Sequence, residues 1–249
     1  MIRVGTSGWS YPTWVGPFYP PGTSAAKMLP QYATHFRTVE AHNTHRRTPT
    51  AAGLERWTTQ VPEDFRFAPK AHVGITHRQD TTGLSERVAA FYAALRPLGA
   101  RLGPVLFVLP HKQPDLARLD ALLAALAAMD RPRAVLELAP GWRVEPVLSR
   151  LAAAPDVSLA VVDRDDDPAA DPAADPAADP AADPAAAPQP VGEILYIRLR
   201  RAVYSAADLD AWASRIAGDG RDVYAYVKHD EAGTGPRYAR DLVARLEQP

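Results

Sequence analysis

The stretch Gly103-Pro-Val-Leu-Phe-Val-Leu-Pro110 decides the fold class that we expect for this chain. Every residue between the flanking glycine and prolines is apolar, and the flanking residues end regular structure on both sides. A short apolar run of this kind is typical of a strand that is buried on both faces, as strands are in parallel sheets covered by helices. The sequence around it should therefore supply helices for both faces of the sheet.

Strand patterns and amphipathic helix patterns alternate along almost the whole chain. The expected strands are Ile2–Thr6, a strand beginning at Thr38, Phe65–Lys70, Gly103–Pro110, Ala134–Leu138, Val157–Asp163, Ile194–Leu199 and Val223–Val227. Between them the 3.6-residue spacing of apolar positions predicts helices over Lys27–Phe36, Thr50–Gln60, Thr82–Leu98, Asp115–Met129, Glu145–Ala154, Ala206–Ala217 and Tyr238–Leu246. Eight such units predict an α/β fold of the (β/α)8 TIM-barrel type, formed as a single domain over residues 1–249.

A doubly wound open sheet is the alternative architecture. It usually carries a glycine-rich turn that opens directly into a helix. Here Gly5-Thr-Ser-Gly8 leads into an aromatic loop, Trp9–Gly22, that prolines and glycines interrupt. The sequence therefore gives no support to a dinucleotide-binding fingerprint.

One βα unit is interrupted between the sixth and seventh expected strands. Asp-Pro-Ala-Ala occurs five times from Asp167 to Ala186. Proline at every fourth position breaks the helical hydrogen-bond ladder, and alanine adds little bulk to a core. We expect residues 165–190 to form a disordered low-complexity loop. Repeat expansion in a tolerant surface loop explains it more simply than an acidic tether for a partner does.

Composition excludes several classes of protein. The 249 residues contain no cysteine, which removes disulfides, thiolate nucleophiles and thiolate zinc sites. No apolar run is long enough for a membrane span, and the N-terminus has no signal-peptide pattern, so we expect a cytoplasmic protein without a membrane partner. The formal net charge of −1 argues against general nucleic-acid binding.

The stretch Thr38-Val-Glu-Ala-His-Asn-Thr-His-Arg-Arg-Thr-Pro49 changes from strand to dense polar chemistry. Other expected strands also end in ionisable residues, and in (β/α)8 barrels these carboxyl ends form the active site. We expect acid/base catalysis from Glu40, His42, His77 and Glu137. The expected substrate-binding residues are Trp9, Arg46, Lys70, Arg198 and Asp230. Lysine and arginine favour an anionic ligand such as a phosphate or carboxylate.

Each candidate also has a structural interpretation. Glu40 and Glu137 could be satisfied by salt bridges to Lys70 or Arg198 without doing chemistry. The His42-x-x-His45 spacing is weak as a metal motif, because residues three apart on a strand point to opposite faces. The cofactor therefore stays unknown. A divalent metal held by histidine and carboxylate groups from separate strands is a secondary hypothesis without a specific motif.

Several segments carry a resemblance to a known family. Val4–Pro20 (Val-Gly-Thr-Ser-Gly-Trp-Ser-Tyr-Pro-Thr-Trp-Val-Gly-Pro-Phe-Tyr-Pro) resembles the N-terminal signature of the DUF72, or YecE-like, family. Phe36–Glu40, Phe65–Lys70 with Ile75–His77, and Leu98–Pro110 are also similar. The resemblance implies a TIM-type barrel. It implies no activity, since none is established for the family.

The chain departs from the family pattern at several strand ends. The family usually continues its second strand as Glu-Ile-Asn-x-Thr-Phe-Tyr, and here His42 stands for the Asn and His45-Arg46 for Phe-Tyr. At the eighth strand Val227-Lys-His-Asp230 replaces Phe-Asn-Asn-Asp. Arg200-Arg201 replaces His-Gly after the seventh strand, and the Arg and His that follow Glu137 in the family are missing. The resemblance thus identifies a divergent member.

Two functions remain open from the sequence. One is a hydrolase- or lyase-type enzyme that uses Glu40 and Glu137 as acid and base on an anionic substrate, with His42 or His77 as proton shuttle. The other is a non-catalytic ligand- or nucleic-acid-binding relative that has lost the family's activity. The sequence does not determine the oligomeric state.

Overall fold

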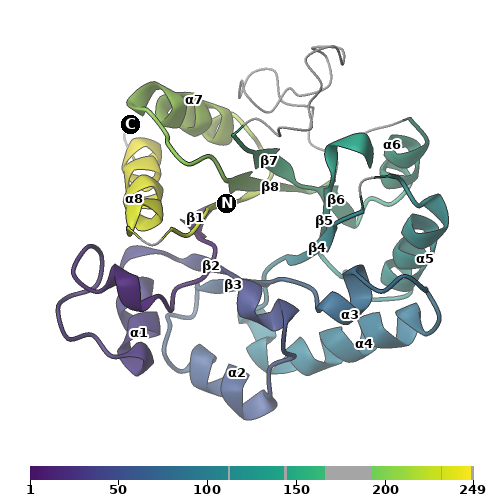
Figure 1. Ribbon diagram of the computed structural model, residues 1–249, viewed down its shortest axis with the longest axis horizontal. Helices are drawn as coiled ribbons and strands as arrows, with labels where there is room; N and C mark the ends of the chain where they lie inside the picture. The colour runs from purple at the N-terminus through teal and green to yellow at the C-terminus, as the bar shows by residue number, and fades with distance from the viewer. Residues whose placement is uncertain (112, 143–144, 166–191, 231, 248–249) are drawn as a thin grey trace.

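The computed structural model describes residues 1–249 except 112, 143–144, 166–191, 231 and 248–249. Strands lie at the centre and helices surround them (Figure 1). The described strands are β1 (Ile2–Thr6), β2 (Thr38–Ala41), β3 (Arg66–Pro69), β4 (Val105–Leu109), β5 (Ala134–Leu138), β6 (Val157–Leu159), β7 (Val161–Asp163), β8 (Ile194–Leu199) and β9 (Asp222–Val227). The predicted repeat loop at 165–190 falls almost entirely outside the described residues.

All strand pairs are parallel. They form three sheets, with orders β1-β9-β8-β7, β2-β3 and β4-β5-β6. Isolated bridges connect neighbouring sheets, Ser7 to Glu40 between β1 and β2 and Lys70 to Leu106 between β3 and β4. The sixth strand predicted from sequence is divided at Ala160, so that β6 pairs with β5 while β7 pairs with β8. The α/β class with parallel sheets is therefore confirmed.

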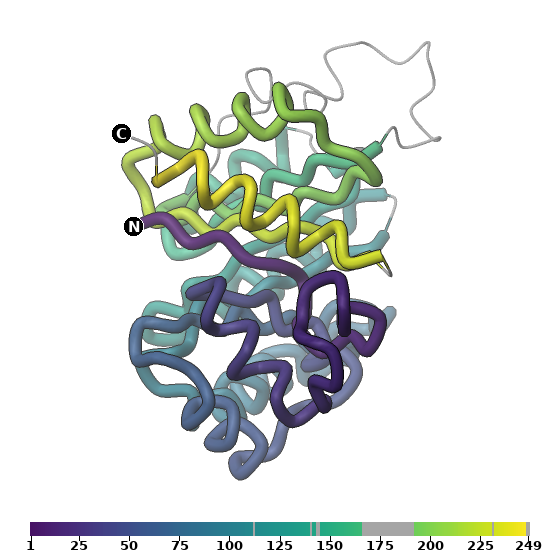
Figure 2. The backbone as a smooth tube through the Cα atoms, turned by 90° about the vertical axis from the view of Figure 1, so that its left-hand side faces the viewer, coloured from purple at the N-terminus to yellow at the C-terminus, as the bar shows by residue number. Residues whose placement is uncertain are grey.

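The helices follow the predicted alternation with shifted ends. They are α1 (Ala25–His35), α2 (Ala51–Thr58), α3 (Val73–Thr76), α4 (Leu84–Leu95), α5 (Leu116–Ala127), α6 (Glu145–Ala152), α7 (Ala206–Ala217) and α8 (Thr234–Leu246). Local chemistry sets several starts, since Thr50, Asp115 and Ser205 each accept a backbone N–H as N-caps. Helix α8 lies beside β1, so the last described helix and the first strand are neighbours (Figure 2).

Short 3₁₀ turns account for the other described elements. They are η1 (Pro12–Trp14), η2 (His42–His45), η3 (Arg96–Arg101) and η4 (Pro140–Trp142). These turns and α3 were not predicted, because each is too short for a periodic apolar pattern. The turn η2 matters most for function, since it follows β2 immediately and redirects the polar residues after Glu40.

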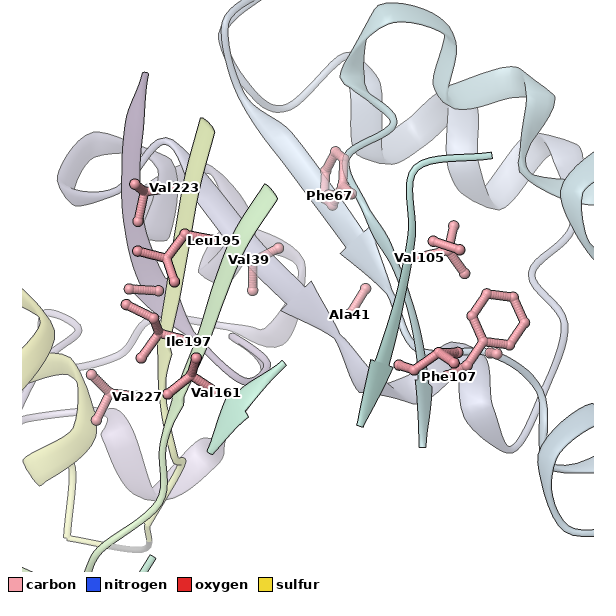
Figure 3. Packing of buried hydrophobic residues seen from close by; sticks show 14 of the residues in the cluster. Val39, Ala41, Phe67, Val105, Phe107, Val161, Leu195, Ile197, Val223 and Val227 are labelled. Carbon is pink, nitrogen blue, oxygen red and sulfur yellow. The ribbon is translucent and has the colours of Figure 1, made fainter. Parts of the chain in front are cut away.

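Successive residues of the strands belong in turn to two different buried clusters. On β8, Leu195 and Ile197 belong to the larger cluster between strands and helices, whereas Ile194 and Tyr196 belong to a smaller one. Figure 3 shows part of the larger cluster, including Val39, Phe67 and Ile197. The smaller cluster also contains Ala68, Leu106, Val135, Val162, Tyr224 and Tyr226 from other strands. Because side chains alternate with period two, Arg198 points to the same side as Tyr196.

Candidate functional site

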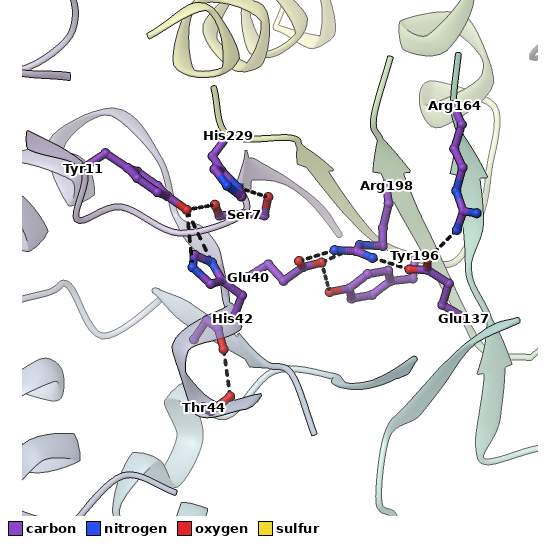
Figure 4. Close-up of polar contacts among 11 residues, drawn as sticks. Ser7, Tyr11, Glu40, His42, Thr44, Glu137, Arg164, Tyr196, Arg198 and His229 are labelled. Atoms are coloured by element: carbon purple, nitrogen blue, oxygen red, sulfur yellow. Dashed lines mark hydrogen bonds and ion pairs between the residues drawn. The ribbon is translucent and has the colours of Figure 1, made fainter. Parts of the chain in front are cut away.

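A buried ion-pair network joins the carboxyl ends of three strands (Figure 4). Arg198 of β8 donates from Nη2 to Glu40 Oε1 at 2.6 Å and from Nε to Glu40 Oε2 at 2.9 Å. Its Nη1 donates to Glu137 Oε2 of β5. Tyr196 donates its hydroxyl to Glu40 Oε2 at 2.9 Å, and Arg164 donates to Glu137 Oε1 at 2.5 Å. Both carboxylates therefore have fixed donors on each oxygen.

The electrostatics of this network favour the charged forms of Glu137 and Arg198. Burial alone would raise the pKa of Glu137, but the guanidinium groups of Arg198 and Arg164 outweigh it and the pKa lies below its usual value. Burial likewise opposes the charge on Arg198, and the two carboxylates overcome it and raise the pKa of Arg198. Glu137 and Arg198 thus stabilise each other in their charged forms, and Glu137 is poorly suited to donate a proton.

Lys70 and Arg200 add positive charge beside this unit. Both side chains are half-buried, and among the described residues neither side chain forms a hydrogen bond or ion pair. Burial lowers the pKa of each, and the neighbouring Arg198 lowers it further. In the described part of the chain, the acidic groups that attract Lys70 and Arg200 are the carboxylates of Glu40 and Glu137, which already pair with Arg198 and Arg164. This excess of positive over negative side chains favours the binding of an anion.

A second polar group lies next to Glu40 and consists of Ser7, Tyr11, His42 and His229. Tyr11 donates its hydroxyl to the Ser7 carbonyl at 2.8 Å and lies 3.4 Å from His42 Nε2. Ser7 Oγ is 3.5 Å from His229 Nδ1, and the His42 and His229 rings are nearly parallel with centroids 5.4 Å apart. Figure 4 shows these side chains beside the Glu40 end of the ion-pair network.

Both imidazoles in this group favour the neutral form. Burial lowers the pKa of His42, and the neighbouring His229 lowers it further. Burial also lowers the pKa of His229, with Arg200 adding to the effect. A neutral imidazole can accept a proton at one nitrogen while it donates from the other. Histidines and glutamates were both predicted as acid/base groups. His42 is better suited to transfer a proton than Glu40 or Glu137, whose carboxylates are held in ion pairs.

The turn η2 separates His42 from His45. Thr44 holds the turn by donating its hydroxyl to the Ala41 and Lys70 carbonyls at 2.8 and 2.7 Å. His45 instead bonds the Ala71 carbonyl through Nδ1 at 2.7 Å, and its ring lies 5.0 Å from that of His77. The two histidines thus face different neighbours. Within the described residues, no group of three or more His, Cys, Asp or Glu side chains is arranged to hold a metal ion.

The structure brings some of the predicted site residues together and separates others. Glu40, His42, Lys70, Glu137 and Arg198 lie in one connected neighbourhood. Four other predicted residues have different surroundings. His77 and Arg46 are exposed. Trp9 packs edge-on against Trp57, and Asp230 accepts the N–H groups of Thr234 and Gly235 at the start of α8. Asp230 and Trp9 thus have evident structural partners.

Sequence reasoning did not select several residues that the geometry places at the site. These are Ser7, Tyr11, Arg164, Tyr196, Arg200 and His229. Strand alternation could have found Tyr196, because it lies two residues before Arg198 on the same face. Arg164 and His229 follow their strands in loops, whose direction no periodic pattern reveals.

None of the described helices combines the length and the apolar character that crossing a lipid bilayer requires.

Comparison with known proteins gives the class of this molecule. The family model described as "Protein of unknown function DUF72" matches residues 3–249, and the chain belongs to this family. The resemblance inferred from the sequence is therefore confirmed. The family model itself is described as one of unknown function.

Individual relatives match a smaller part of the chain. The UPF0759 protein YecE of Escherichia coli strain K12 is 32% identical over 110 residues, which cover 44% of this chain and 38% of YecE. The UPF0759 protein YunF of Bacillus subtilis strain 168 is 33% identical over 116 residues, or 44% of this chain and 40% of YunF. The chain thus aligns with less than half the length of these curated relatives.

Solved structures of the family share the fold over the whole chain. A DUF72 family protein from Thermotoga maritima MSB8 superposes with a TM-score of 0.82 at 21% identity, covering 100% of both chains. One from Enterococcus faecalis V583 superposes with a TM-score of 0.73 at 16% identity, covering 100% of this chain and 96% of that one. Identities this low carry the fold and not the function.

Proposed function

We propose that the carboxyl ends of the strands bind an anionic small molecule and act on it by hydrolase- or lyase-type acid/base chemistry. The observation that carries this proposal is the pair of half-buried cations, Lys70 and Arg200, whose side chains form no ion pair or hydrogen bond among the described residues. Burying a charge without a partner costs free energy. A bound phosphate or carboxylate would supply the missing charge.

The contacts support a division of roles among the predicted residues. Glu40 and Glu137 are committed to Arg198 and Arg164, which favours a positioning role for them over the acid/base role expected from sequence. They hold the Arg198 guanidinium in place near Lys70 and Arg200. His42, neutral and partly accessible, is then the proposed general base or acid, with the Tyr11 hydroxyl 3.4 Å away as its hydrogen-bond partner.

The proposed architecture behind this site is a closed (β/α)8 barrel of one domain. Two features support closure beyond the sheets themselves. The bridges from Ser7 to Glu40 and from Lys70 to Leu106 span the gaps between sheets, and the short connection through Ala160 joins β6 to β7. In such a barrel Glu40, Glu137 and Arg198 lie inside the mouth, where barrel enzymes bind substrate.

Calorimetry with defined anions tests the binding step. We expect wild-type protein to bind inorganic phosphate or acetate, and the Lys70→Met/Arg200→Met double variant to lose at least tenfold in affinity, because each charge-assisted contact contributes about 1.5–3 kcal/mol. Lys27→Met is the matched control, since Lys27 is exposed on α1 and away from the site. Absence of anion binding by wild type, or equal binding by the double variant, contradicts the proposal.

A second experiment separates catalysis from binding alone. A panel of phosphate and carboxylate esters is incubated with wild type and with His42→Asn, which keeps a polar side chain but removes the titratable imidazole. Turnover that falls at least a hundredfold in the variant supports acid/base chemistry. Anion binding without any turnover favours the non-catalytic ligand-binding alternative, which the engagement of both carboxylates in ion pairs already suggests.

A further inference from the structure

A small cavity adjoins the candidate site on the side of the first βα loop. Its volume is about 100 Å³, and it is lined by Gly8, Trp9, Ser10, Tyr11, His42 and Asn43. The loop is tied to the end of β2, because the Gly8 N–H donates to the Glu40 carbonyl at 2.9 Å. Three of the six lining residues carry planar rings. The cavity is therefore an aromatic extension of the polar site.

The rings that form its walls are fixed in place. Trp9 packs edge-on against Trp57 with centroids 5.0 Å apart, and its carbonyl accepts the Tyr19 hydroxyl at 2.5 Å. Tyr11 is held by the hydrogen bond to the Ser7 carbonyl and by Trp14, whose ring is 4.6 Å away. His42 is backed by His229. Pre-organised walls reduce the entropy that binding has to overcome.

Gly8 permits these walls to approach one another. Its φ of 87° is a conformation that other residues adopt only with strain. A Cβ atom at this position would also overlap the Tyr11 hydroxyl and the His42 ring. At the entrance, Ser10 and Asn43 are exposed, so the cavity opens to solvent.

We propose that this cavity receives a single planar ring of the anionic ligand, while the anionic group reaches Lys70 and Arg200. A closed cavity of roughly 150 Å³ can hold one benzene molecule. This cavity of about 100 Å³ is smaller and open to solvent, so it can take one ring with an edge left outside but no fused system. The ligand class is then a one-ring aryl or heteroaryl carboxylate or phosphate. This inference rests on the proposed function, because it assumes that Lys70 and Arg200 hold the anionic group.

Three carboxylates of graded shape test the ring preference. We expect benzoate to bind wild-type protein about three- to tenfold more tightly than cyclohexanecarboxylate, because a flat π-system stacks on Trp9, Tyr11 or His42 and a puckered saturated ring does not. Acetate, which has no ring, should bind most weakly. Calorimetry or ligand-observed NMR titration supplies the dissociation constants.

Two variants at the exposed entrance locate the effect. Ser10→Phe introduces a tethered ring that competes for the cavity, and we expect benzoate affinity to fall to that of acetate while acetate binding is unchanged. Ser10→Ala, the matched control, should keep the benzoate preference. Thermal unfolding of both variants verifies that the fold is intact.

The outcomes distinguish this inference from the function on which it rests. Equal affinity for benzoate and cyclohexanecarboxylate, or full benzoate binding by Ser10→Phe, overturns the ring-binding cavity alone. If the ring-binding cavity is overturned but the Lys70→Met/Arg200→Met variant still loses acetate affinity, the proposed anion site remains supported. No binding of any of the three carboxylates overturns the proposed function and the inference together.

Discussion

The two ends of the strands carry charge in opposite ways. At the amino ends, Asp222 of β9 accepts from the Met1 amino group at 3.2 Å and from Arg133, which precedes β5, at 3.1 Å. These side chains are between 39% and 66% exposed. At the carboxyl ends, Glu40, Glu137 and Arg198 form their pairs at exposures of 6% or less. The ion pairs of Asp222 at the amino ends are open to water, and those of Arg198 at the carboxyl ends are buried.

The difference indicates which end has a task beyond stability. An exposed pair gains little free energy and costs little to lose. A buried network costs desolvation that apolar side chains would avoid, so its stability alone does not explain it. At the carboxyl ends the cost is increased by Lys70 and Arg200, which form no ion pair among the described residues. Charge that is both buried and unbalanced is what a ligand site requires.

The largest expected effect comes from removing the shared arginine. Arg198→Met leaves Glu40 and Glu137 buried without their main donor, and we expect the free energy of unfolding to fall by about 3–5 kcal/mol. Urea denaturation followed by circular dichroism measures the change.

The amino end supplies the control for this variant. Arg133→Met removes one exposed partner of Asp222, and we expect a loss of at most about 1 kcal/mol. Comparable losses in the two variants would mean that the two ends do not differ energetically, and would remove the argument for a dedicated site at the carboxyl ends.

A smaller effect should appear on acidification. The pKa values of His42, His45, His77 and His229, all at the carboxyl ends, are lowered by burial. Below the unfolded-state value of about 6.5 the unfolded chain binds protons that the folded chain does not. The free energy of unfolding should therefore decrease as pH falls from about 7, and level off below the folded-state pKa values.

Melting temperatures between pH 8 and pH 5 test this expectation. The double variant His42→Asn/His229→Asn removes the two stacked imidazoles and keeps side chains that form hydrogen bonds. We expect its melting temperature to depend on pH more weakly than that of wild type. Parallel curves for the two proteins would show that this pair does not contribute, and would place the acid sensitivity elsewhere.

The sequence predicted the fold better than the site because the two depend on different kinds of pattern. Apolar runs such as Val105–Leu109 and amphipathic helices such as Ala206–Ala217 repeat with the period of their own backbone, so their positions could be read locally. The division of the sixth strand at Ala160 has no local signal. It depends on pairing with two different neighbours.

Site residues could be predicted where they lie inside a strand or directly after one. Strand alternation and chemistry agree at Glu40, Glu137 and Arg198, and His42 and Lys70 are the first residues after their strands. Asp230 and Trp9 were both predicted to bind substrate from their residue type and position. Asp230 accepts N–H groups at the start of α8, and Trp9 packs on Trp57 while it also lines the cavity at the first βα loop. The contact between Trp9 and Trp57 joins residues distant in sequence, and a single sequence does not reveal such a contact.

The smallest expected effect has the opposite sign and bears most directly on function. Lys70→Met removes a half-buried cation for which burial and repulsion by Arg198 and Arg200 outweigh attraction by Glu40 and Glu137, and its apolar replacement fills similar space. We expect the free energy of unfolding to rise by about 0.5–1 kcal/mol, as at sites where stability is given up for function. Lys27→Met, on the exposed face of α1, should change it by less than about 0.5 kcal/mol. Urea denaturation in buffers without phosphate or carboxylate measures both variants. A stability loss in Lys70→Met under these conditions would show that Lys70 already has a stabilising partner within the protein, and the cation pair would no longer indicate an absent anion.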